Sequence, residues 1–179
     1  MSTENFRISG SGGQGIITLG IILAEAAIQN GKLAVQSQSY GPEARGGASK
    51  CEVIISDEDI FYPKIIIPDV LISMSQKAAD KYGDEIKEDG IIIIDSSMIE
   101  NFTNAKATIY NLPITQIARE DFGNPLYANI LMLGAIVGIT EILSLDKMKE
   151  AIKTRFPKAY EINIQALEKG YLEAKKLLE

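Results

Sequence analysis

The chain has 179 residues, 46% of them hydrophobic, and a net charge of −6 from 18 basic and 24 acidic side chains. This length suits one compact core, so we expect a single domain over residues 1–179. Because the basic side chains are scattered, the sequence lacks the basic patch of a nucleic-acid-binding protein.

Two residue types that carry much protein chemistry are nearly absent, since the chain has no histidine and one cysteine, Cys51. It therefore lacks an imidazole acid or base and a Ser–His or Cys–His nucleophile pair. By itself it cannot hold an iron–sulfur cluster or a thiolate zinc site. We expect any chemistry it takes part in to be carried largely by other molecules. The polar residues 1–5 lack the features of a secretory signal, which favours a cytoplasmic location.

The first predicted elements are a strand at residues 6–9, a glycine-rich turn at 10–15 and an apolar helix at 16–29. Gly31 is the expected helix stop, and residues 32–36 form the next strand. This βαβ unit implies a parallel sheet. Charged and apolar residues alternate over 50–55, which predicts a strand with one wetter face, added antiparallel at an edge.

Further strands are predicted at residues 70–74, 91–95 and 105–110, with helices at 75–82 and 114–120. Four consecutive isoleucines before Asp95 indicate a central strand. The fold class expected is α/β, a Rossmann-like three-layer sandwich whose mainly parallel sheet has an antiparallel edge and C-terminal helices.

The C-terminal third is predicted to be helical, beginning with Asn124-Pro125 as cap and first residue of a helix over 126–143. Its run 130–139 contains no polar residue, and Gly134 and Gly138 are spaced as in paired membrane helices. A bilayer needs about 20 apolar residues, so a buried core helix is the better interpretation. Ser144 caps the next helix, which ends before Pro157, and the last helix covers 158–178. Its apolar stripe could dock on the domain or on a partner.

Gly10, Gly12 and Gly15 match the pattern G-x-G-x-x-G between a strand and a helix. Gly10 permits a tight turn, Gly12 lets a ligand approach the backbone, and Gly15 lets the helix pack on the strand. The helix N-terminus favours a phosphate or carboxylate there. A dinucleotide site also needs an acidic residue about 20 positions further on, and Gln-Ser-Gln at 36–38 argues against NAD or FAD. Packing without any ligand, or binding of an anion such as a coenzyme phosphate, remain as alternatives.

A second glycine cluster, residues 39–48, contains Tyr40, Glu43, Arg45 and Gly46. Its glycines allow a shaped loop, in which Arg45 is a planar donor suited to carboxylate or phosphate. Tyr40 could stack on a ligand or plug the loop. The alternative is an ordinary turn whose charged side chains are solvated or paired locally.

Other candidate groups have simpler interpretations. Adjacent carboxylates at residues 57–59 are more often solvated than bound to a metal. Asp95 follows a strand where open α/β sheets bind ligands, but it could equally cap the following turn. Cys51 is most simply a small core residue.

Taken in order, these motifs resemble those of the gamma subunit, or gamma domain, of 2-oxoacid:ferredoxin oxidoreductases. The resemblance extends over essentially the whole chain. The amino-acid sequence of residues 37–50 is most similar to that of the 2-oxoglutarate branch. Branches that act on pyruvate or branched-chain oxoacids share the core motifs. The residues that carry the resemblance are the turn Gly10-Ser11-Gly12-Gly13-Gln14-Gly15, the loop 39–47, Ser56-Asp57, Tyr62-Pro63, Pro68-Asp69-Val70, the strand 90–95 and Gly123-Asn124-Pro125.

The resemblance implies a multi-subunit enzyme that oxidatively decarboxylates a 2-oxoacid, with coenzyme A as co-substrate and ferredoxin as electron acceptor. Thiamine diphosphate, Mg and iron–sulfur clusters would lie on partner subunits (alpha, beta and ferredoxin-like delta), and this chain alone would be inactive. It would supply no catalytic residue or metal ligand and would bind neither nucleic acid nor membrane. The turn 10–15, Tyr40, Glu43, Arg45 and Gly46 would contact coenzyme A or a subunit boundary.

Two other functions remain compatible with the sequence. One is a free-standing nucleotide-binding protein with an incomplete fingerprint, which leaves the second glycine cluster unexplained. The other is a purely structural interaction subunit whose glycines serve packing alone. In isolation, bare apolar surface would also permit a homodimer.

Overall fold

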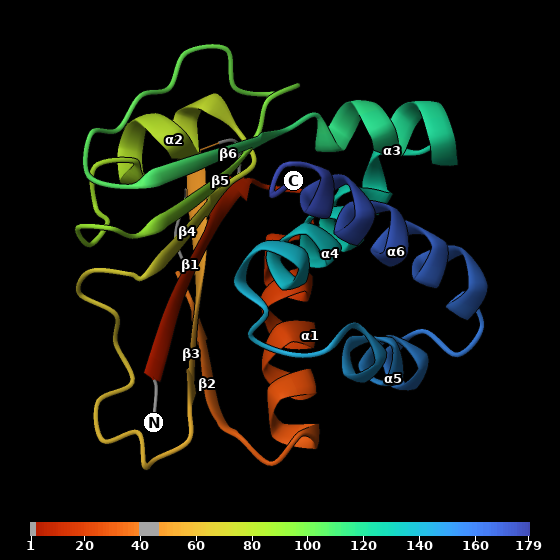
Figure 1. Cartoon of the computed structure of the whole chain (residues 1–179), viewed down its shortest axis with the longest axis horizontal. Coiled ribbons are helices and arrows are strands. Elements are labelled where there is room, and N and C mark those ends of the chain that lie inside the picture. The colour runs from red at the N-terminus through yellow and green to blue at the C-terminus, as the bar shows by residue number, and fades with distance from the viewer. Residues whose placement is uncertain (1–2, 40–46) are drawn as a thin grey trace.

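A computed structural model describes residues 3–39 and 47–179 of the chain, as a mixed sheet flanked by helices (Figure 1). In chain order the elements are β1 (Thr3–Ser11), α1 (Ile16–Gln29), β2 (Leu33–Gln38), β3 (Ala48–Ser56), β4 (Val70–Ser73), α2 (Gln76–Tyr82), β5 (Ile91–Asp95), β6 (Thr108–Leu112), α3 (Ile114–Phe122), the short 3-10 helix η2 (Pro125–Tyr127), α4 (Ala128–Thr140), α5 (Leu145–Arg155) and α6 (Tyr160–Lys176).

The six strands follow the order β2-β3-β1-β4-β5-β6. Strands β1, β4, β5 and β6 pair in parallel, whereas β3 pairs antiparallel with both β1 and β2. This confirms a mainly parallel sheet with an antiparallel edge. The βαβ prediction needs one correction, because β1 and β2 run in the same direction but β3 lies between them. Consequently β3 is not the edge strand, and eight of its nine residues are buried, so the expected wetter face is absent.

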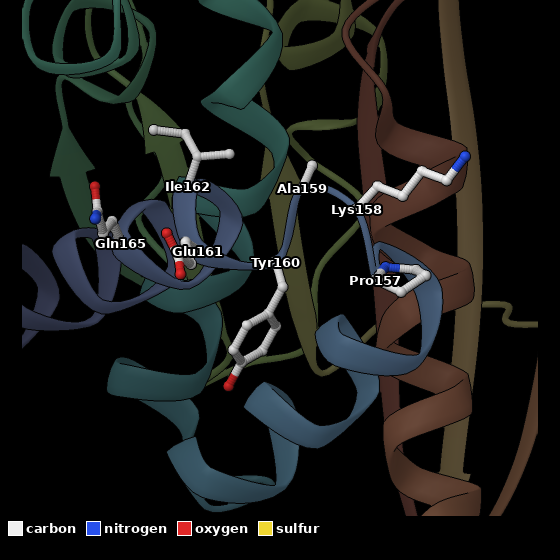
Figure 2. A pocket seen from close by; sticks show the side chains of 7 residues that line it. All are labelled: Pro157, Lys158, Ala159, Tyr160, Glu161, Ile162 and Gln165. Carbon is white, nitrogen blue, oxygen red and sulfur yellow. The ribbon is translucent and has the colours of Figure 1, made fainter.

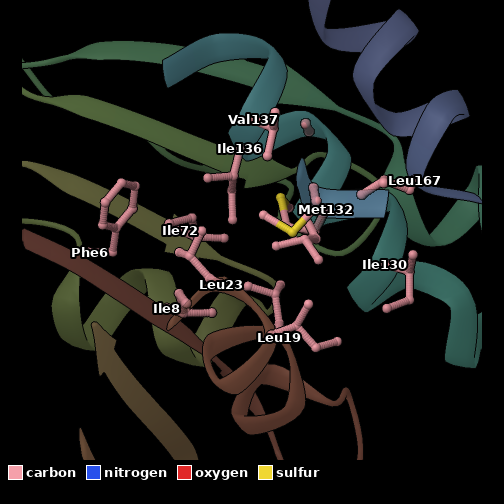
Figure 3. Close-up of a cluster of buried hydrophobic side chains, with 14 of the residues drawn as sticks. Phe6, Ile8, Leu19, Leu23, Ile72, Ile130, Met132, Ile136, Val137 and Leu167 are labelled. Atoms are coloured by element: carbon pink, nitrogen blue, oxygen red, sulfur yellow. The ribbon is translucent and has the colours of Figure 1, made fainter. Parts of the chain in front are cut away.

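Helices cover the two faces of the sheet unequally, with α2 on one face and α1, α4, α5 and α6 on the other (Figure 1). The larger core fills the second side, where apolar side chains of β1, β4, α1 and α4 meet (Figure 3). Phe6 and Ile8 of β1 face Ile136 and Met132 of α4 across this core. Burial of these side chains is the main stabilising contribution.

The nearly all-apolar α4 is a core helix, as the sequence indicated, and it packs along α6. A Cβ atom added at Gly134 would lie 2.0 Å from the carbonyl oxygen of Leu167, and one at Gly170 would lie 1.9 Å from that of Leu131. The glycines therefore let the two helix backbones touch. Across the described ranges, no helix is both long and apolar enough to traverse a membrane.

The predicted caps are present, although some boundaries differ. Ser75 and Ser144 accept hydrogen bonds from the amides of Ala78 and Lys147. Asn124 caps the short η2 helix, and α4 begins only at Ala128. Strand β6 also lies two to three residues later than predicted, over Thr108–Leu112.

A buried cation that the sequence analysis did not identify lies on the α2 side of the sheet. Arg7 is 1% exposed, and its Nε donates to Glu52 Oε1 at 2.8 Å. Its Nη1 also pairs with Glu85, and Lys50 Nζ lies 2.9 Å from Glu52 Oε1. Arg7 and Glu52 neutralise each other, so Glu52 is buried instead of solvated. This explains why β3 has no solvent-exposed face.

Candidate functional site

The glycine turn lies where β1 ends, beside the carboxyl end of the parallel strand β4. Gly13 and Gly15 have φ angles of 87° and 75°, a left-handed conformation that side chains disfavour. Gln14 closes the turn, because its Oε1 accepts from the Ser11 amide at 2.7 Å and its Nε2 donates to the Met74 carbonyl at 2.6 Å. The turn is thus tied to β4 and held in one shape.

Two glycines of the pattern make close contacts that the sequence did not predict. A Cβ atom on Gly10 would lie 2.6 Å from Gln14 Oε1, so the missing side chain makes room for Gln14. A Cβ on Gly15 would lie 2.5 Å from Asn129 Nδ2, so Gly15 permits contact with α4. Helix α1 approaches a strand closely at Gly20 instead. A Cβ atom on Gly20 would lie 2.3 Å from Cys51 Sγ of β3.

The N-terminus of α1 follows this turn; among the described residues no side chain caps it, and its first turn contains no acidic residue. Gly15 occupies the cap position, where serine or aspartate would otherwise accept hydrogen bonds from the helix amides. The first backbone N–H groups of a helix have no acceptor within the helix and carry the positive end of its dipole. This end of α1 therefore suits an acceptor that comes from outside the helix.

A cleft of about 440 Å³ lies against this helix end, and we call it the glycine-turn cleft. It is bounded by the turn and α1, by the segment that leads into α4, and by the start of α6. Its lining residues are Gly13, Gln14, Gly15, Thr18, Asn124, Leu126, Tyr127, Asn129, Ile130, Phe156, Ala159 and Asn163.

Two buried amides, Asn129 and Asn163, lie among the polar lining residues of this cleft, with Gln14, Thr18 and Asn124. Asn129 Nδ2 lies 3.4 Å from the Gly15 carbonyl, and Asn163 Nδ2 donates to the Ala159 carbonyl at 2.8 Å. The sequence analysis identified neither as a site residue. Asn129 carried one signal, a polar side chain at the start of an otherwise apolar helix.

A second hollow, of about 540 Å³, lies at the turn from α5 into α6 and is drawn in Figure 2. All its lining residues fall within 157–165, and Tyr160 points from there toward α5, where Lys153 Nζ lies 5.9 Å from its ring centre. One short segment thus forms the hollow, without polar groups that converge from separate elements, so the glycine-turn cleft is the better candidate.

The second glycine cluster is only partly described, because Tyr40, Glu43, Arg45 and Gly46 lie outside the described residues. The described residues resume at Gly47, and β3 begins at Ala48, which is paired in register with Ser11. Ser49 Oγ also donates to the Gly10 carbonyl at 3.2 Å. The end of the second cluster is therefore next to the glycine turn.

The remaining candidates have structural roles. Asp95 Oδ2 accepts from the Thr115 amide and hydroxyl, and its Oδ1 accepts from Ser97. It is fully buried and joins the end of β5 to α3. Lys32 pairs with Asp57 at 2.9 Å, and within residues 3–39 and 47–179 no metal-ligating group of three or more His, Cys, Asp or Glu is found. Cys51 is a core residue as expected, and burial raises the pKa of its thiol to about 11.

These features define an α/β protein with an ordered glycine turn, an uncapped helix end and an adjoining cleft. The profile of the pyruvate ferredoxin/flavodoxin oxidoreductase family matches residues 5–173. The chain therefore belongs to this family.

Three known proteins illustrate the similarity. The 2-oxoglutarate synthase subunit KorC of Methanocaldococcus jannaschii is 49% identical over 97% of this chain and 95% of its own length. The crystal structure of a keto/oxoacid ferredoxin oxidoreductase gamma subunit from Geobacter sulfurreducens superposes with a TM-score of 0.86 at 42% identity, covering 96% of this chain and 98% of that one. The ketoisovalerate oxidoreductase subunit VorA of Methanothermobacter thermautotrophicus is 36% identical over 97% of this chain, which corresponds to 37% of VorA. The relatives are thus subunits of 2-oxoacid:ferredoxin oxidoreductases, and the 2-oxoglutarate branch is the most similar.

Proposed function

We propose that this chain, as one gamma-type domain over residues 1–179, is the gamma subunit of a 2-oxoglutarate:ferredoxin oxidoreductase. The complex would convert 2-oxoglutarate and coenzyme A to the acyl-coenzyme A, CO₂ and reduced ferredoxin. The observation that carries the proposal is the 49% identity to a 2-oxoglutarate synthase subunit across nearly the full length of both chains.

The residue content of the chain supports a division of labour within the complex. With no histidine and a single, buried cysteine, it has no ligand set for an iron–sulfur cluster. Thiamine diphosphate, Mg and the clusters would be bound by alpha, beta and ferredoxin-like delta subunits in the cytoplasm. Those groups would supply the oxidative chemistry, and this chain would supply binding surface.

The glycine-turn cleft is the part of this chain that we assign to coenzyme A or to a partner carboxylate. The uncapped end of α1 and the glycine backbone suit a phosphate or carboxylate. Apolar Leu126, Ile130 and Phe156 suit a less polar part of the same ligand. Arg45 belongs to the second glycine cluster, whose last residue, Ala48, pairs with Ser11. Its guanidinium group would add a cation able to make two parallel hydrogen bonds to a phosphate or carboxylate.

Substitution of Arg45 by alanine in the reconstituted complex tests this assignment. Loss of a charge-assisted contact worth about 1.5–3 kcal/mol would raise the KM for coenzyme A, or weaken assembly, by roughly 10- to 100-fold. Arg119→Ala is the matched control, because Arg119 is exposed on α3, outside the cleft lining. Unchanged KM and unchanged assembly in Arg45→Ala would contradict the assignment.

The subunit role itself is tested by affinity isolation of the tagged chain from its native cell. We expect stoichiometric partner chains, the absorbance of iron–sulfur clusters and ferredoxin reduction that depends on 2-oxoglutarate. Titration of the isolated chain with NAD and FAD addresses the free-standing nucleotide-binding alternative, and saturable binding of either would favour that alternative.

A further inference from the structure

The loop between β3 and β4, residues 57–69, presents large apolar side chains to solvent. Phe61 is 92% exposed, Tyr62 60%, Ile66 77% and Ile67 48%. Single exposed apolar residues are ordinary on protein surfaces, but four within seven positions of one loop are typical of a surface that a partner covers. We call these four residues the loop patch.

The C-terminal half of the loop, from which Ile66 and Ile67 project, is held by hydrogen bonds to β1. Arg7 Nη2 donates to the carbonyl oxygens of Ile65 and Ile66 at 3.1 and 3.4 Å. Ile65 is itself buried, and the Asp69 amide donates to the Asn5 carbonyl at 2.9 Å. The fully buried Arg7 thus holds the backbone from which Ile66 projects. A surface that is ordered before binding loses less entropy when a partner arrives.

A recess lies beside the loop patch. Pro63, Lys64 and Ile65 form one wall of a groove of about 490 Å³, whose other walls are β2 and β3. Val35, Pro63 and Ile65 are its apolar lining residues, and the others are polar or charged: Gln36, Ser37, Gln38, Ser39, Lys50, Glu52 and Lys64. Protein interfaces concentrate binding energy where a side chain of one partner fills such a recess beside exposed aromatic residues.

The relatives indicate that a domain of this kind is joined to further protein. In VorA the part equivalent to this chain is 37% of the polypeptide, so there it is covalently joined to further chain. A separate chain must make the corresponding association through its surface alone. We propose that the loop patch docks this chain onto a partner subunit of the oxidoreductase complex. The inference rests on the proposed function and assigns a surface to that assembly.

The charge beside the patch narrows the chemistry of the partner. The loop begins with Asp57-Glu58-Asp59, all three exposed, of which Asp57 pairs with Lys32, and the exposed Lys64 lies further along the loop. Glu58 and Asp59 therefore leave the start of the loop acidic, which suits a partner surface with basic groups beside its apolar centre. An anionic membrane or a nucleic acid would be repelled by these carboxylates. A second copy would bring the same acidic segment to a twofold interface, which favours a different chain over a homodimer.

The test uses the full-length tagged chain expressed together with its partner subunits. Phe61→Ser/Ile66→Ser changes two highly exposed side chains, and Leu172→Ser is the matched control because Leu172, on α6, is 56% exposed. We expect the double variant to retain at least tenfold less partner subunit than the wild type, with unchanged circular dichroism and thermal unfolding. The control is expected to retain partner as the wild type does.

Each other outcome overturns a stated part of the account. A double variant that retains partner at the wild-type level would reject the docking surface and leave the proposed function intact. A wild-type chain that retains no partner would reject the proposed function and the docking surface together. If light scattering shows a wild-type dimer that the double variant loses while partner retention is unchanged, the surface belongs to a second copy.

Discussion

Ser11, the last residue of β1, lies directly opposite Ala48, the first residue of β3, in the antiparallel register of the two strands. Ser11 belongs to the first glycine motif, and Ala48 ends the second. The two motifs are separated by α1 and β2 in sequence but meet at one end of the paired strands β1 and β3. Their proximity follows from strand pairing alone, so it exists before any ligand binds.

We expect Gly15→Ala to destabilise the chain more than Gly13→Ala. Both positions have positive φ angles, which cost roughly 1–2 kcal/mol for alanine. Only at Gly15 does a Cβ meet another residue, since no atom lies within 4 Å of a Cβ at Gly13. Urea unfolding measures the free energy of unfolding of each variant. Adding Asn129→Ala to Gly15→Ala removes the clash and should bring the two glycine variants closer in stability. Equal destabilisation by both glycine variants would show that the contact with Asn129 is unimportant.

The close contact between α4 and α6 makes a graded prediction. Gly170→Ala and Gly134→Ala place a methyl group against a backbone carbonyl at 1.9 and 2.0 Å, whereas at Gly138 the nearest atoms are 3.0 Å away. Because backbones cannot rotate aside, the first two variants should each cost about 3 kcal/mol or more, and Gly138→Ala should cost less. Thermal or urea unfolding of the three variants provides the order. A Gly138 variant as unstable as the others would contradict this packing.

Arg7 and Glu52 should be energetically coupled. Arg7→Met leaves Glu52 buried without its main cation, and removal of one partner of a buried pair costs about 3–5 kcal/mol. Arg7→Met combined with Glu52→Leu should be more stable than Arg7→Met alone. A double-mutant cycle by chemical unfolding measures the coupling. Additive single effects would mean that the two side chains do not stabilise each other.

Much of the fold could be predicted because it depends on local signals. The helix α1 has the predicted bounds, Ile16–Gln29, and Ser75, Asn124 and Ser144 cap the elements that follow them. Apolar periodicity and capping are properties of neighbouring residues, so one sequence reveals them.

The errors concern pairings between residues distant in the chain. The position of β3 between β2 and β1 depends on strand order, which local patterns do not encode. Glu52 looked solvated because its partner, Arg7, is 45 residues away in sequence. Likewise, the contact of Gly15 with Asn129 spans 114 residues, so the pattern could identify the glycine but not what it touches.

The thiol of Cys51 should be unreactive in the folded chain and should affect stability only at high pH. Burial raises its pKa from 9.0 to about 11, which favours the protonated thiol in the folded state. The unfolded chain therefore loses its proton first, and this contribution to stability, present below pH 9, is lost as the pH rises toward 11.

Two measurements check this behaviour. At pH 8 a thiol reagent should modify the chain only as fast as it opens. Relative to Cys51→Ala, the wild type should lose stability between pH 9 and 11 by on the order of 1 kcal/mol per pH unit. Rapid labelling of the folded chain would show that the thiol is accessible, and identical pH profiles for the two proteins would show that folding does not raise its pKa.

The most direct test of the subunit assignment is ferredoxin reduction with 2-oxoglutarate and coenzyme A, measured for the complex reconstituted with and without this chain. We expect activity only when the chain and its partners are combined, and none from the chain alone. Turnover by the isolated chain, or full activity of the complex without it, would contradict the assignment.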